Sequence, residues 1–292
     1  MTESSAPVLP QIDRLSGLLE QFRINTHLID AGPLRGVRRY AGDAQGHLHV
    51  VRNGVLRVTH PTGGPLPEEV LVDVPSVLFY PRPVPHEFHP GAPRPETTCA
   101  SLHLAGGGRN PLLQALPPLI RLPLCDVAGL APSIDLLLSE TERVRCGQRL
   151  LADHLFEVVL IQLLRWTLDH PEAVGVASGL IAGLADPRLA RALVAIHEAP
   201  ADAWTLQRMA RTAGMSRTSF ATTFRRVMGR TPGEYLTQLR MGIAQHRLRQ
   251  GDSLTHLAGE LGYASPSALS RAFSAHTGHS PRAWLALQHP GA

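Results

Sequence analysis

The sequence predicts an α+β fold. We expect an N-terminal antiparallel β-barrel followed by helices, and then an all-α region with two helix–turn–helix motifs joined by a long helix. Three observations predict this: strand-like segments fill residues 35–105, helical periodicity begins near residue 112, and one sequence pattern occurs twice after residue 210. The 292 residues suffice for about two domains with separate cores, and 43% hydrophobic against 18% charged residues excludes a wholly disordered chain.

Turn residues divide the first of these regions into short strands. The Asn53-Gly54 pair lies between HLHVVR and VLRVTH, which predicts a two-residue hairpin. Residues 62–65 (TGGP) mark the next turn, and the glycine-rich stretch 106–111 ends the region. This spacing of strands and turns is typical of a small antiparallel barrel or sandwich, which we place at about residues 10–110.

Helical periodicity follows over about residues 131–170. Ile134, Leu137 and Leu138 recur at helical spacing, and the segment LADHLFEVVLIQLLRWTL carries apolar residues on two sides. A helix that is apolar on two sides is buried on two sides. We expect one side to pack on the barrel and the other on a partner chain or on the next domain, so a homodimer is one expectation.

A stretch rich in glycine and alanine separates the two predicted domains. We assign residues 1–172 to the N-terminal domain, residues 173–187 to a linker in which a short helix could form, and residues 188–292 to the C-terminal domain. No apolar run reaches the roughly 18–20 residues that span a bilayer. The start of the chain lacks a signal-peptide pattern, and the three cysteines are too few for a disulfide framework. We therefore expect a cytoplasmic protein that does not enter a membrane.

Charge is distributed unevenly along the chain. All 28 basic residues are arginines. Up to residue 175 there are 15 arginines against 18 acidic residues, a net charge of −3, and after it 13 arginines against 6, a net charge of +7. A basic C-terminal part joined to a slightly acidic N-terminal part indicates that one domain meets a polyanion such as nucleic acid.

The basic part contains a duplicated module. One copy begins at Ala210 (ARTAGMSRTSFATTFRRVMGRTPGEYL) and the other at Ala258 (AGELGYASPSALSRAFSAHTGHSPRAWL). Landmark residues recur in the same order in both copies. The pairs include Gly214 with Gly262, Phe224 with Phe273, Gly229 with Gly278, Pro232 with Pro281, and Tyr235 with Trp284. Two copies are too few for a solenoid, so we interpret them as paired units of one domain.

Each copy has the pattern of a helix–turn–helix with a polar second helix. Gly214 and Gly262 supply the turns, and Ser216 and Ser265 are expected to cap the second helices. The outward faces carry arginine, serine and threonine, which bind phosphates and base edges. The predicted DNA-binding residues are Arg217, Thr218, Ser219, Thr222, Arg225 and Arg226 in the first unit, and Ser265, Ser267, Ser270 and Arg271 in the second.

A long helix is predicted between the two units. The sequence Thr231-Pro232-Gly233-Glu234 has the form of a capping box with proline at the first helical position, and Gly251 is a stop signal. A helix from this box to Gln250 measures roughly 27 Å at 1.5 Å per residue. Such a spacer can hold two recognition helices about one DNA turn, roughly 34 Å, apart.

Residues 187–288 resemble the DNA-binding region of the AraC/XylS transcription regulators, through the motifs AGMSRTSFATTFRRVMGRTPGEYLTQLRM and LAGELGYASPSALSRAFSAHTGHSPRAWL. The resemblance implies a regulator, not an enzyme, that binds promoter DNA through two adjacent major grooves and works with RNA polymerase. The base-reading positions of the family fall on Thr218, Ser219, Ala221 and Thr222, and on Pro266, Ser267, Ser270 and Arg271. Since Ala221 and Pro266 offer no donor, we expect shape readout, Arg217 and Arg225 to contribute more.

The N-terminal region resembles the cupin-like sensor domain of one AraC subgroup, through HLHVVRNG, VLFYPRPVPHEF and LLQALPPLIRL. Cupin metal sites use two histidines in an HxH motif, a glutamate shortly after it and a later histidine. His47, His49 and His86 match that outline, but Asn53 and Gly54 occupy the distance of the glutamate. The metal set implied by the resemblance is therefore incomplete.

Three kinds of signal are alternatives for what the barrel would sense. His49, His86, His89, Cys99 and His103 could converge inside the barrel, where imidazole and thiolate ligands suit zinc or another soft metal. A small organic effector is the second kind, and an oxidant that reacts with Cys99 is the third. Histidines that merely pack on a strand are the simpler interpretation, and Cys125 and Cys146 are expected to be packing residues. The alternative function is a metal-dependent cupin enzyme with an accessory helical domain.

Overall fold

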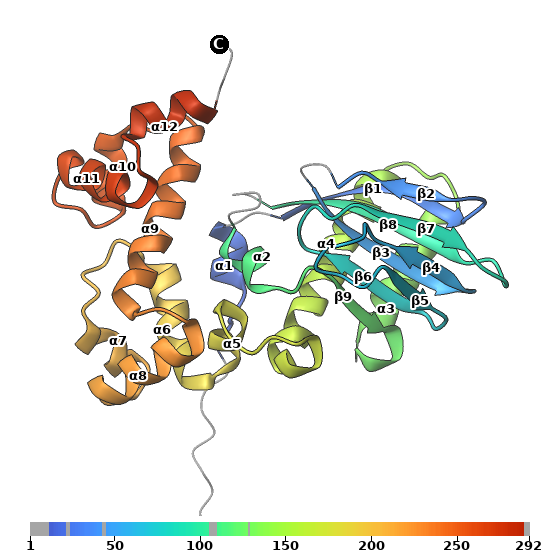
Figure 1. The fold of residues 1–292 in the computed structure, drawn as a ribbon, viewed down its shortest axis with the longest axis horizontal. Coiled ribbons are helices and arrows are strands. Elements are labelled where there is room, and N and C mark those ends of the chain that lie inside the picture. Colours follow the sequence, from blue (N-terminus) through green and yellow to red (C-terminus); the bar gives the residue numbers. More distant parts are fainter. Residues whose placement is uncertain (1–11, 22–23, 43–44, 105–109, 128, 289–292) are drawn as a thin grey trace, which may run out of the picture.

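The computed structural model describes residues 12–21, 24–42, 45–104, 110–127 and 129–288. Its N-terminal half contains two antiparallel β-sheets with helices against them, and its C-terminal half is helical, so the predicted fold class is confirmed (Figure 1). Within the described residues, no helix is both long enough and apolar enough to cross a membrane.

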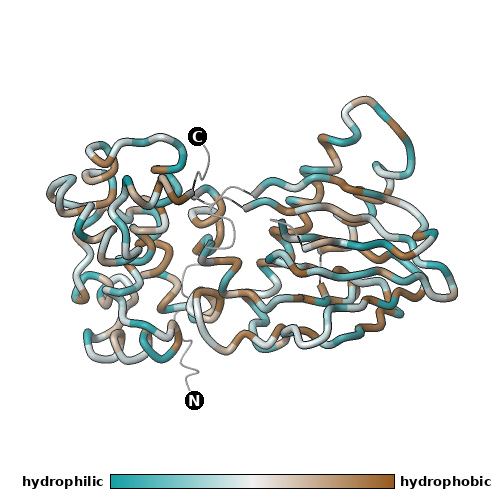
Figure 2. Tube along the Cα trace, turned by 45° about the horizontal axis from the view of Figure 1, so that its top comes forward, coloured by the Kyte–Doolittle hydropathy of each residue, from teal (hydrophilic) through white to brown (hydrophobic). Residues whose placement is uncertain are grey.

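Nine strands build the two sheets. A five-stranded sheet has the order β1-β8-β3-β6-β9, and a four-stranded sheet has the order β2-β7-β4-β5. The strands are β1 (Ile24–Pro33), β2 (Arg38–Tyr40), β3 (Gly46–Asn53), β4 (Leu56–Thr59), β5 (Glu69–Val72), β6 (Ser76–Tyr80), β7 (His86–Pro90), β8 (Glu96–Leu104) and β9 (Ile120–Pro123). Hydrophobic and hydrophilic residues alternate along β4 (LRVT) and β9 (IRLP), and Figure 2 shows the two kinds interspersed along the chain of the β-half.

Strand β3 is buried on both sides because it lies between the barrel interior and the helices. Leu48 and Val50 join the core that contains the helices, whereas Val51 joins the core between the sheets. Since successive side chains of a strand point to opposite faces, His47 and His49 lie on the same side as Val51. Both histidines therefore point into the barrel.

The predicted hairpin at Asn53-Gly54 is wrong. β3 pairs with β6 and β8, whereas β4 pairs with β5 and β7, so this turn carries the chain from one sheet to the other. Gly54 has a φ of +73°, and a Cβ on it would lie 2.6 Å from the carbonyl oxygen of Arg94. The amide of Val55 donates to the carbonyl of Pro93 at 2.8 Å. Segment 93–94, and not β4, is thus the neighbour of the turn, while the TGGP turn does join the paired strands β4 and β5.

The five-stranded sheet continues beyond residue 110, where we expected the barrel to end. After α2 (Pro111–Ala115), which Asn110 caps, β9 pairs with β6. Pro117 and Pro118 shortly before this four-residue strand, and Pro123 at its end, conceal it in the sequence pattern. Within the glycine-rich stretch, residues 106–109 lie outside the described residues.

Two long helices follow the sheet, as expected. They are α3 (Leu130–Thr141) and α4 (Gln148–Asp169), preceded by the short helix η2 (Leu124–Asp126). Helix α4 packs against α3, β1 and α5, which cover part of both its apolar sides. The predicted second neighbour is therefore at least in part the next region of the chain. Val158, in the segment LADHLFEVVLIQLLRWTL that we expected to be buried on two sides, is 40% exposed.

The stretch expected as a linker is folded and largely buried. It contains η3 (Pro171–Val174) and α5 (Leu180–Ala185), and Ile181 and Leu184 of α5 have no exposed surface. One continuous hydrophobic cluster runs from Leu15 of the N-terminal half to Leu239 of the C-terminal half. The first helix–turn–helix unit thus shares a core with the N-terminal half.

Seven helices make up the described part of the C-terminal half. They are α6 (Pro187–Glu198), α7 (Leu206–Thr212), α8 (Arg217–Met228), α9 (Pro232–Arg249), α10 (Leu254–Glu260), α11 (Pro266–Thr277) and α12 (Pro281–Gln288), while α1 (Ser16–Gln21) from the N-terminal half packs against α6. Met241 to Trp284 form a separate cluster beneath the second unit. Helix α9 runs along the whole half and connects the two units (Figure 1).

A buried histidine in the first unit predicts a pH dependence of its stability. His197 Nε2 lies 2.6 Å from the Tyr235 hydroxyl, and burial lowers the pKa of His197 to about 4. Between that value and the ordinary 6.5, the unfolded chain binds a proton that the folded chain does not, so stability falls as the pH drops through this range. From pH 7 to pH 5, the wild type should lose about 2 kcal/mol more unfolding free energy than His197→Leu. Urea denaturation of both proteins measures this, and equal losses would contradict the assignment.

Two of the three cysteines differ from expectation. Cys125 and Cys146 are exposed, so the expectation that they pack in the core is wrong. Both lie outside the buried stripes of the helices, at η2 and just before α4, where no periodicity indicates the buried side. Cys99 is fully buried on β8.

Candidate nucleic-acid interface and buried histidine cluster

The first unit, α7 and α8, begins each helix with a hydroxyl cap. The Thr205 side chain accepts a hydrogen bond from the amide of Arg208, and the Ser216 side chain accepts one from the amide of Ser219. Gly214 has a φ of +65° between the helices, as the turn requires. Phe220 and Phe224 are fully buried, which fixes the outward face of α8.

The predicted DNA-binding side chains of α8 lie on that outward face. All six are exposed: Arg217, Thr218, Ser219, Thr222, Arg225 and Arg226. Among the described residues, no acidic side chain forms an ion pair with the three arginines of this group. Their charges are thus available to an external anion such as a phosphate.

The second unit, α10 and α11, repeats the arrangement. Leu269 and Phe273 of α11 are fully buried. Ser267 and Arg271 are exposed, and Ser270 is partly buried. The Ser265 hydroxyl accepts a hydrogen bond from the amide of Ala268 at 3.1 Å, so this predicted contact residue also starts the helix.

Helix α9 has the length and the start that the sequence predicts. It spans 18 residues, and its capping box is complete, with Thr231 and Glu234 each bonded to the backbone of the other. Gly251, at a φ of +95°, follows its end. One uninterrupted helix therefore joins α8 to α10 and limits how far the two recognition helices can separate.

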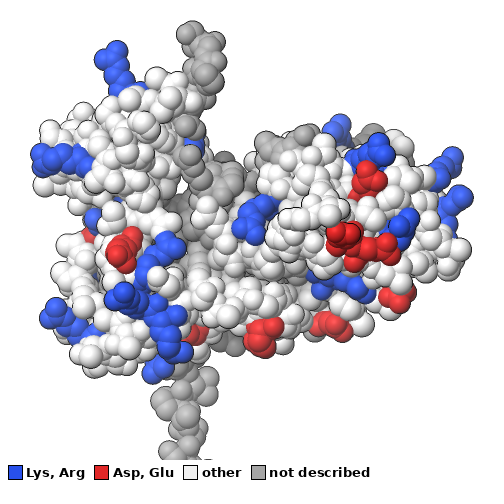
Figure 3. Space-filling model, viewed as in Figure 1, with Lys and Arg blue, Asp and Glu red and all other residues white. Residues whose placement is uncertain are grey.

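Charge on the surface follows the division seen in the sequence. Arginines gather over the lower part of the helical half, around the first unit, whereas most acidic side chains in this view lie over the β-half (Figure 3). The two recognition helices thus belong to the basic half of the molecule.

Three buried histidines form a cluster inside the barrel. His47, His49 and His86 come from β3 and β7, and one ring nitrogen of each lies within 4.8 Å of the others. His49 Nε2 is 3.0 Å from His86 Nε2. Burial and the neighbouring histidines lower the pKa of His49 well below its ordinary value, and burial lowers that of His86 to about 3. These two rings are therefore neutral and carry lone pairs at physiological pH.

The hydrogen bonds of the pair assign the lone pairs. His86 Nδ1 lies 2.7 Å from the carbonyl oxygen of Val84, so it must carry the proton and donate. His86 Nε2 then carries a lone pair that points to His49. His49 Nδ1 is buried and has no hydrogen-bond partner among the residues that the structure describes. A metal-binding histidine commonly donates its second nitrogen to a backbone carbonyl in this way.

Aromatic rings enclose the cluster. Tyr40 stacks on His86 at 4.6 Å between centroids, Tyr80 stacks on the same ring at 4.0 Å, and Phe88 lies 4.7 Å from His49. The sequence reasoning missed both tyrosines, and it also missed His60, which lies 2.9 Å from the Tyr80 hydroxyl. An expectation of alternating inward residues at 38–40 and 76–80 would have flagged the tyrosines.

Cys99 lies beside the cluster as a thiol. The Tyr40 hydroxyl donates to its Sγ at 3.2 Å, and burial raises its pKa to about 11. The thiolate is the form that reacts with oxidants and metals. The geometry thus gives little support to an oxidant sensor at Cys99.

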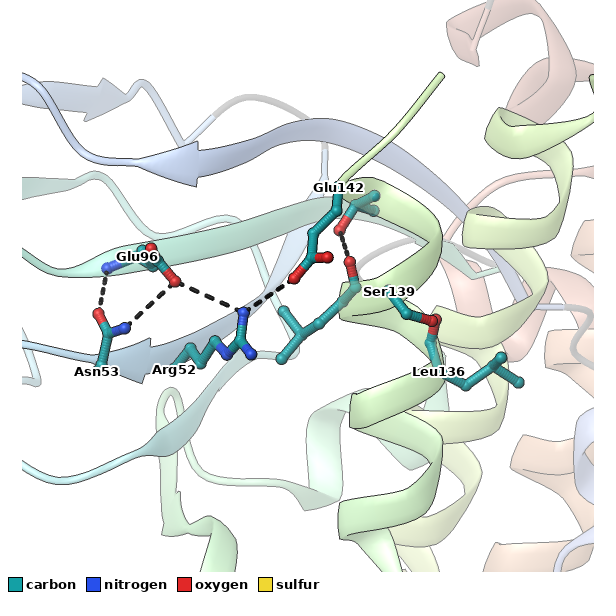
Figure 4. Close-up of polar contacts among 8 residues, drawn as sticks. Arg52, Asn53, Glu96, Leu136, Ser139 and Glu142 are labelled. Atoms are coloured by element: carbon teal, nitrogen blue, oxygen red, sulfur yellow. Dashed lines mark hydrogen bonds and ion pairs between the residues drawn. The ribbon is translucent and has the colours of Figure 1, made fainter. Parts of the chain in front are cut away.

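Other candidates of the sequence lie outside the cluster. His89 bonds with Thr59 at 3.0 Å, and His103 is exposed on β8 beside His27. Asn53, at the distance of the cupin glutamate, exchanges two hydrogen bonds with Glu96 near Arg52, away from the barrel interior (Figure 4). Residue 53 therefore does not supply a metal ligand in place of the cupin glutamate.

The three histidines fit a zinc-like ion in donor type. Neutral imidazoles suit zinc, and three protein ligands leave a fourth position open. The close pair of Nε2 atoms, 3.0 Å apart, is as expected for two ligands that face a shared ion. His47, His49 and His86 are the residues that would hold it.

Comparisons with known protein families cover both halves. A family model described as Cupin matches residues 13–169, and one described as Helix-turn-helix domain matches residues 209–286. The matches border the stretch with η3, α5 and α6. Together they agree with the division into a barrel half and a helical half.

Named relatives are regulators. A Streptomyces lividans protein named as an AraC-like transcription regulator is 38% identical over 192 residues, 61% of this chain and 61% of that protein. The HTH-type transcriptional regulator AlkR of Acinetobacter baylyi is 32% identical over 178 residues, 59% of this chain and 57% of AlkR. The chain thus spans about three fifths of the length of these curated relatives.

Among solved structures, fatty-acid-bound ToxT of Vibrio cholerae matches with 13% identity and a TM-score of 0.39, over 93% of this chain and 97% of ToxT.

Proposed function

Because the chain belongs to the AraC-like transcription regulators that carry an N-terminal cupin domain, we propose that it regulates transcription by binding promoter DNA through α8 and α11. The two helices enter adjacent major grooves, and arginines at the exposed faces bind phosphates. A signal taken up by the cupin domain biases how the two helices are presented.

The observation that carries the proposal is the pair of capped helix–turn–helix units on one rigid helix. Both units bury the same side of their second helix; the first exposes arginine, serine and threonine, and the second exposes Arg271 and Ser267. An accessory helical bundle would not need a basic, unpaired face twice at fixed separation.

The core shared with the cupin domain supports signal transmission. Helix α5 packs on α4 of the N-terminal half and on α8 of the first unit. The amide of Gly179 donates to the carbonyl of Val227 at the end of α8. A shift of α4 or α5 therefore reaches a recognition helix through direct contacts.

The proposed partners are RNA polymerase and a second copy of the chain. Large apolar side chains are exposed on α3 and α4, among them Leu136 at 51%, Leu150 at 64% and Val158 at 40%. Exposed apolar residues on neighbouring helices favour an interface between copies. Light scattering of the full chain measures the dimer.

Selection of DNA tests the regulator function. The purified full-length protein should enrich a limited set of sequences from a genomic library at fixed salt, and affinity should fall steeply as salt rises. A variant with both Arg217→Ala and Arg271→Ala should lose the enrichment, because it removes one arginine from each recognition helix. Equal recovery of all sequences by the wild type would refute specific DNA binding.

We also propose that the cupin domain binds a zinc-like ion through His47, His49 and His86. The ion would tie β3 to β7 and would present an open position to a signal molecule. The rival function, a metal-dependent cupin enzyme, has weaker support because the named relatives are regulators.

Zinc should stabilise the protein through these histidines. At 100 times the dissociation constant, a ligand that binds only the folded state adds about 2.7 kcal/mol. We therefore expect added Zn²⁺ to raise the Tm of the wild type but not of His49→Ala, with His89→Ala as the matched control. Metal analysis after dialysis should give near-stoichiometric zinc. Equal responses of the two variants would contradict the assignment.

A further inference from the structure

The two helix–turn–helix units have separate cores, so α9 alone would leave their relative angle weakly fixed. The buried core of the first unit ends at Leu239 on α9 and that of the second begins at Met241, with the partly buried Ile243 packed against both. Arg240 lies at the boundary between them. Recognition of two adjacent grooves requires a defined separation and rotation of the two units.

Arg240 binds both units across this boundary. Its Nε donates to the carbonyl of Pro200 and its Nη2 to the carbonyl of Asp202, each at 2.8 Å. On the other side, its guanidinium carbon lies 5.6 Å from the ring centroid of Tyr263. The forked, planar guanidinium thus donates hydrogen bonds to the loop before α7 and lies over the Tyr263 ring in the turn before α11.

The turn of the second unit approaches the same loop very closely. A Cβ on Gly262 would lie 2.1 Å from the carbonyl oxygen of Ala201 and 2.8 Å from Arg240 Nη2. Gly262 also has a φ of +71°, which disfavours other residues. Only glycine lets the backbones of the two units come this near.

The loop that Arg240 binds, residues 199–204, is held against α7 by further contacts. Trp204 Nε1 donates to the carbonyl of Ala199 at 2.8 Å, and Arg208 donates to the Asp202 carboxylate at 2.5 Å. The Arg208 guanidinium lies 4.2 Å from the Trp204 ring centroid. A continuous set of contacts therefore leads from the first helix–turn–helix through residues 199–204 and Arg240 to the second.

We propose that Arg240 is a positioning residue that sets the spacing of the two DNA half-sites the protein accepts. The inference rests on the proposed DNA binding. One inserted base pair rotates a half-site by about 35°, since a DNA turn holds about 10–10.5 base pairs. Two units that the contacts of Arg240 hold at one angle cannot follow this rotation, whereas units without these contacts can.

Binding to DNA of varied spacing tests the proposal. The probes are the selected site, the same site with one or two base pairs inserted or deleted between its halves, and a single half-site. We expect one inserted base pair to cost the wild type about tenfold in affinity, and Arg240→Met less than about threefold. Arg240→Met should bind the single half-site like the wild type, and Arg240→Lys, which keeps the charge but not the fork, should fall between.

Arg247→Met is the matched control. It removes the same charge from the same helix, but among the described residues Arg247 forms its ion pairs with Asp252 and Glu260, close to the second unit. Its spacing profile should remain that of the wild type. Identical profiles for Arg240→Met and Arg247→Met would overturn the proposal. If Arg240→Met does not fold, Arg240→Lys and Gly262→Ala replace it, and both should still tolerate the inserted base pair better than the wild type.

A distance measurement without DNA separates this proposal from the proposed function. Spin labels are placed at the exposed positions Gln207 and Ala275 in full-length protein with Cys125→Ser and Cys146→Ser. The wild type should give one narrow distance distribution, and Arg240→Met one at least about twice as wide. Equal widths of the distance distributions for the wild type and Arg240→Met overturn the positioning role of Arg240, even if the protein binds DNA. A widened distribution in a protein that binds no DNA supports the clamp and refutes the DNA-binding function.

Discussion

Replacing Arg225 and Arg226 together with alanine should lower affinity for the selected DNA about 100-fold, because each charge-assisted phosphate contact is worth about 1.4 kcal/mol or more. Both arginines are exposed at the end of α8 and have no ion-pair partner among the described residues. The slope of log affinity against log salt should decrease by about 1.8, since each lost contact contributes about 0.9. Titration by fluorescence anisotropy at several salt concentrations measures both quantities.

Arg282→Ala is a suitable control for general charge. Arg282 is exposed on α12 and belongs to neither recognition helix. It should change affinity less than about threefold, as a screened surface charge does. If it matched the double variant, binding would depend on overall charge and not on the face of α8.

Replacing Leu184 with alanine should destabilise the protein by about 3 kcal/mol, through lost burial and a residual cavity. Leu184 has no exposed surface and lies in the core that joins the cupin domain to the first helix–turn–helix unit. Its neighbour Gly183 is closely packed, since a Cβ there would lie 2.4 Å from Met228 Sδ. We also expect the variant to separate the unfolding of the two regions into distinct transitions.

Denaturant unfolding followed by far-UV circular dichroism measures this effect. Leu287→Ala, which deletes the same atoms at a position that is 58% exposed, is the control and should change stability by less than about 0.5 kcal/mol. A loss for Leu184→Ala no larger than the control value would show that α5 does not join the regions.

The helical half was more predictable from sequence than the barrel. Caps, turn glycines and buried phenylalanines are local signals, so Ser216, Gly214 and Phe220 predict their own roles. The Asn53-Gly54 turn also looks local, but its meaning depends on which strand lies opposite. Only the packing of segment 93–94 against Gly54 shows that the chain changes sheet there.

The same limit applies to the histidine cluster. The HxH pattern and the family resemblance pointed to His47, His49 and His86, and the structure brings these three together. Tyr40, Tyr80 and His60 enclose them from distant strands, and no spacing in the sequence links these positions. The shared core through α5 was likewise hidden, because a stretch rich in glycine and alanine resembles a linker until its neighbours are known.

Hydroxyl-radical footprinting of the full-length protein on its selected DNA tests the central claim most directly. We predict two protected patches on one face of the duplex, about 10–10.5 base pairs apart, because α8 and α11 would occupy adjacent major grooves. Arg217→Ala should weaken one patch, and Arg271→Ala the other. A single patch, or two patches that both variants weaken equally, would contradict a reading of DNA by two separate recognition helices.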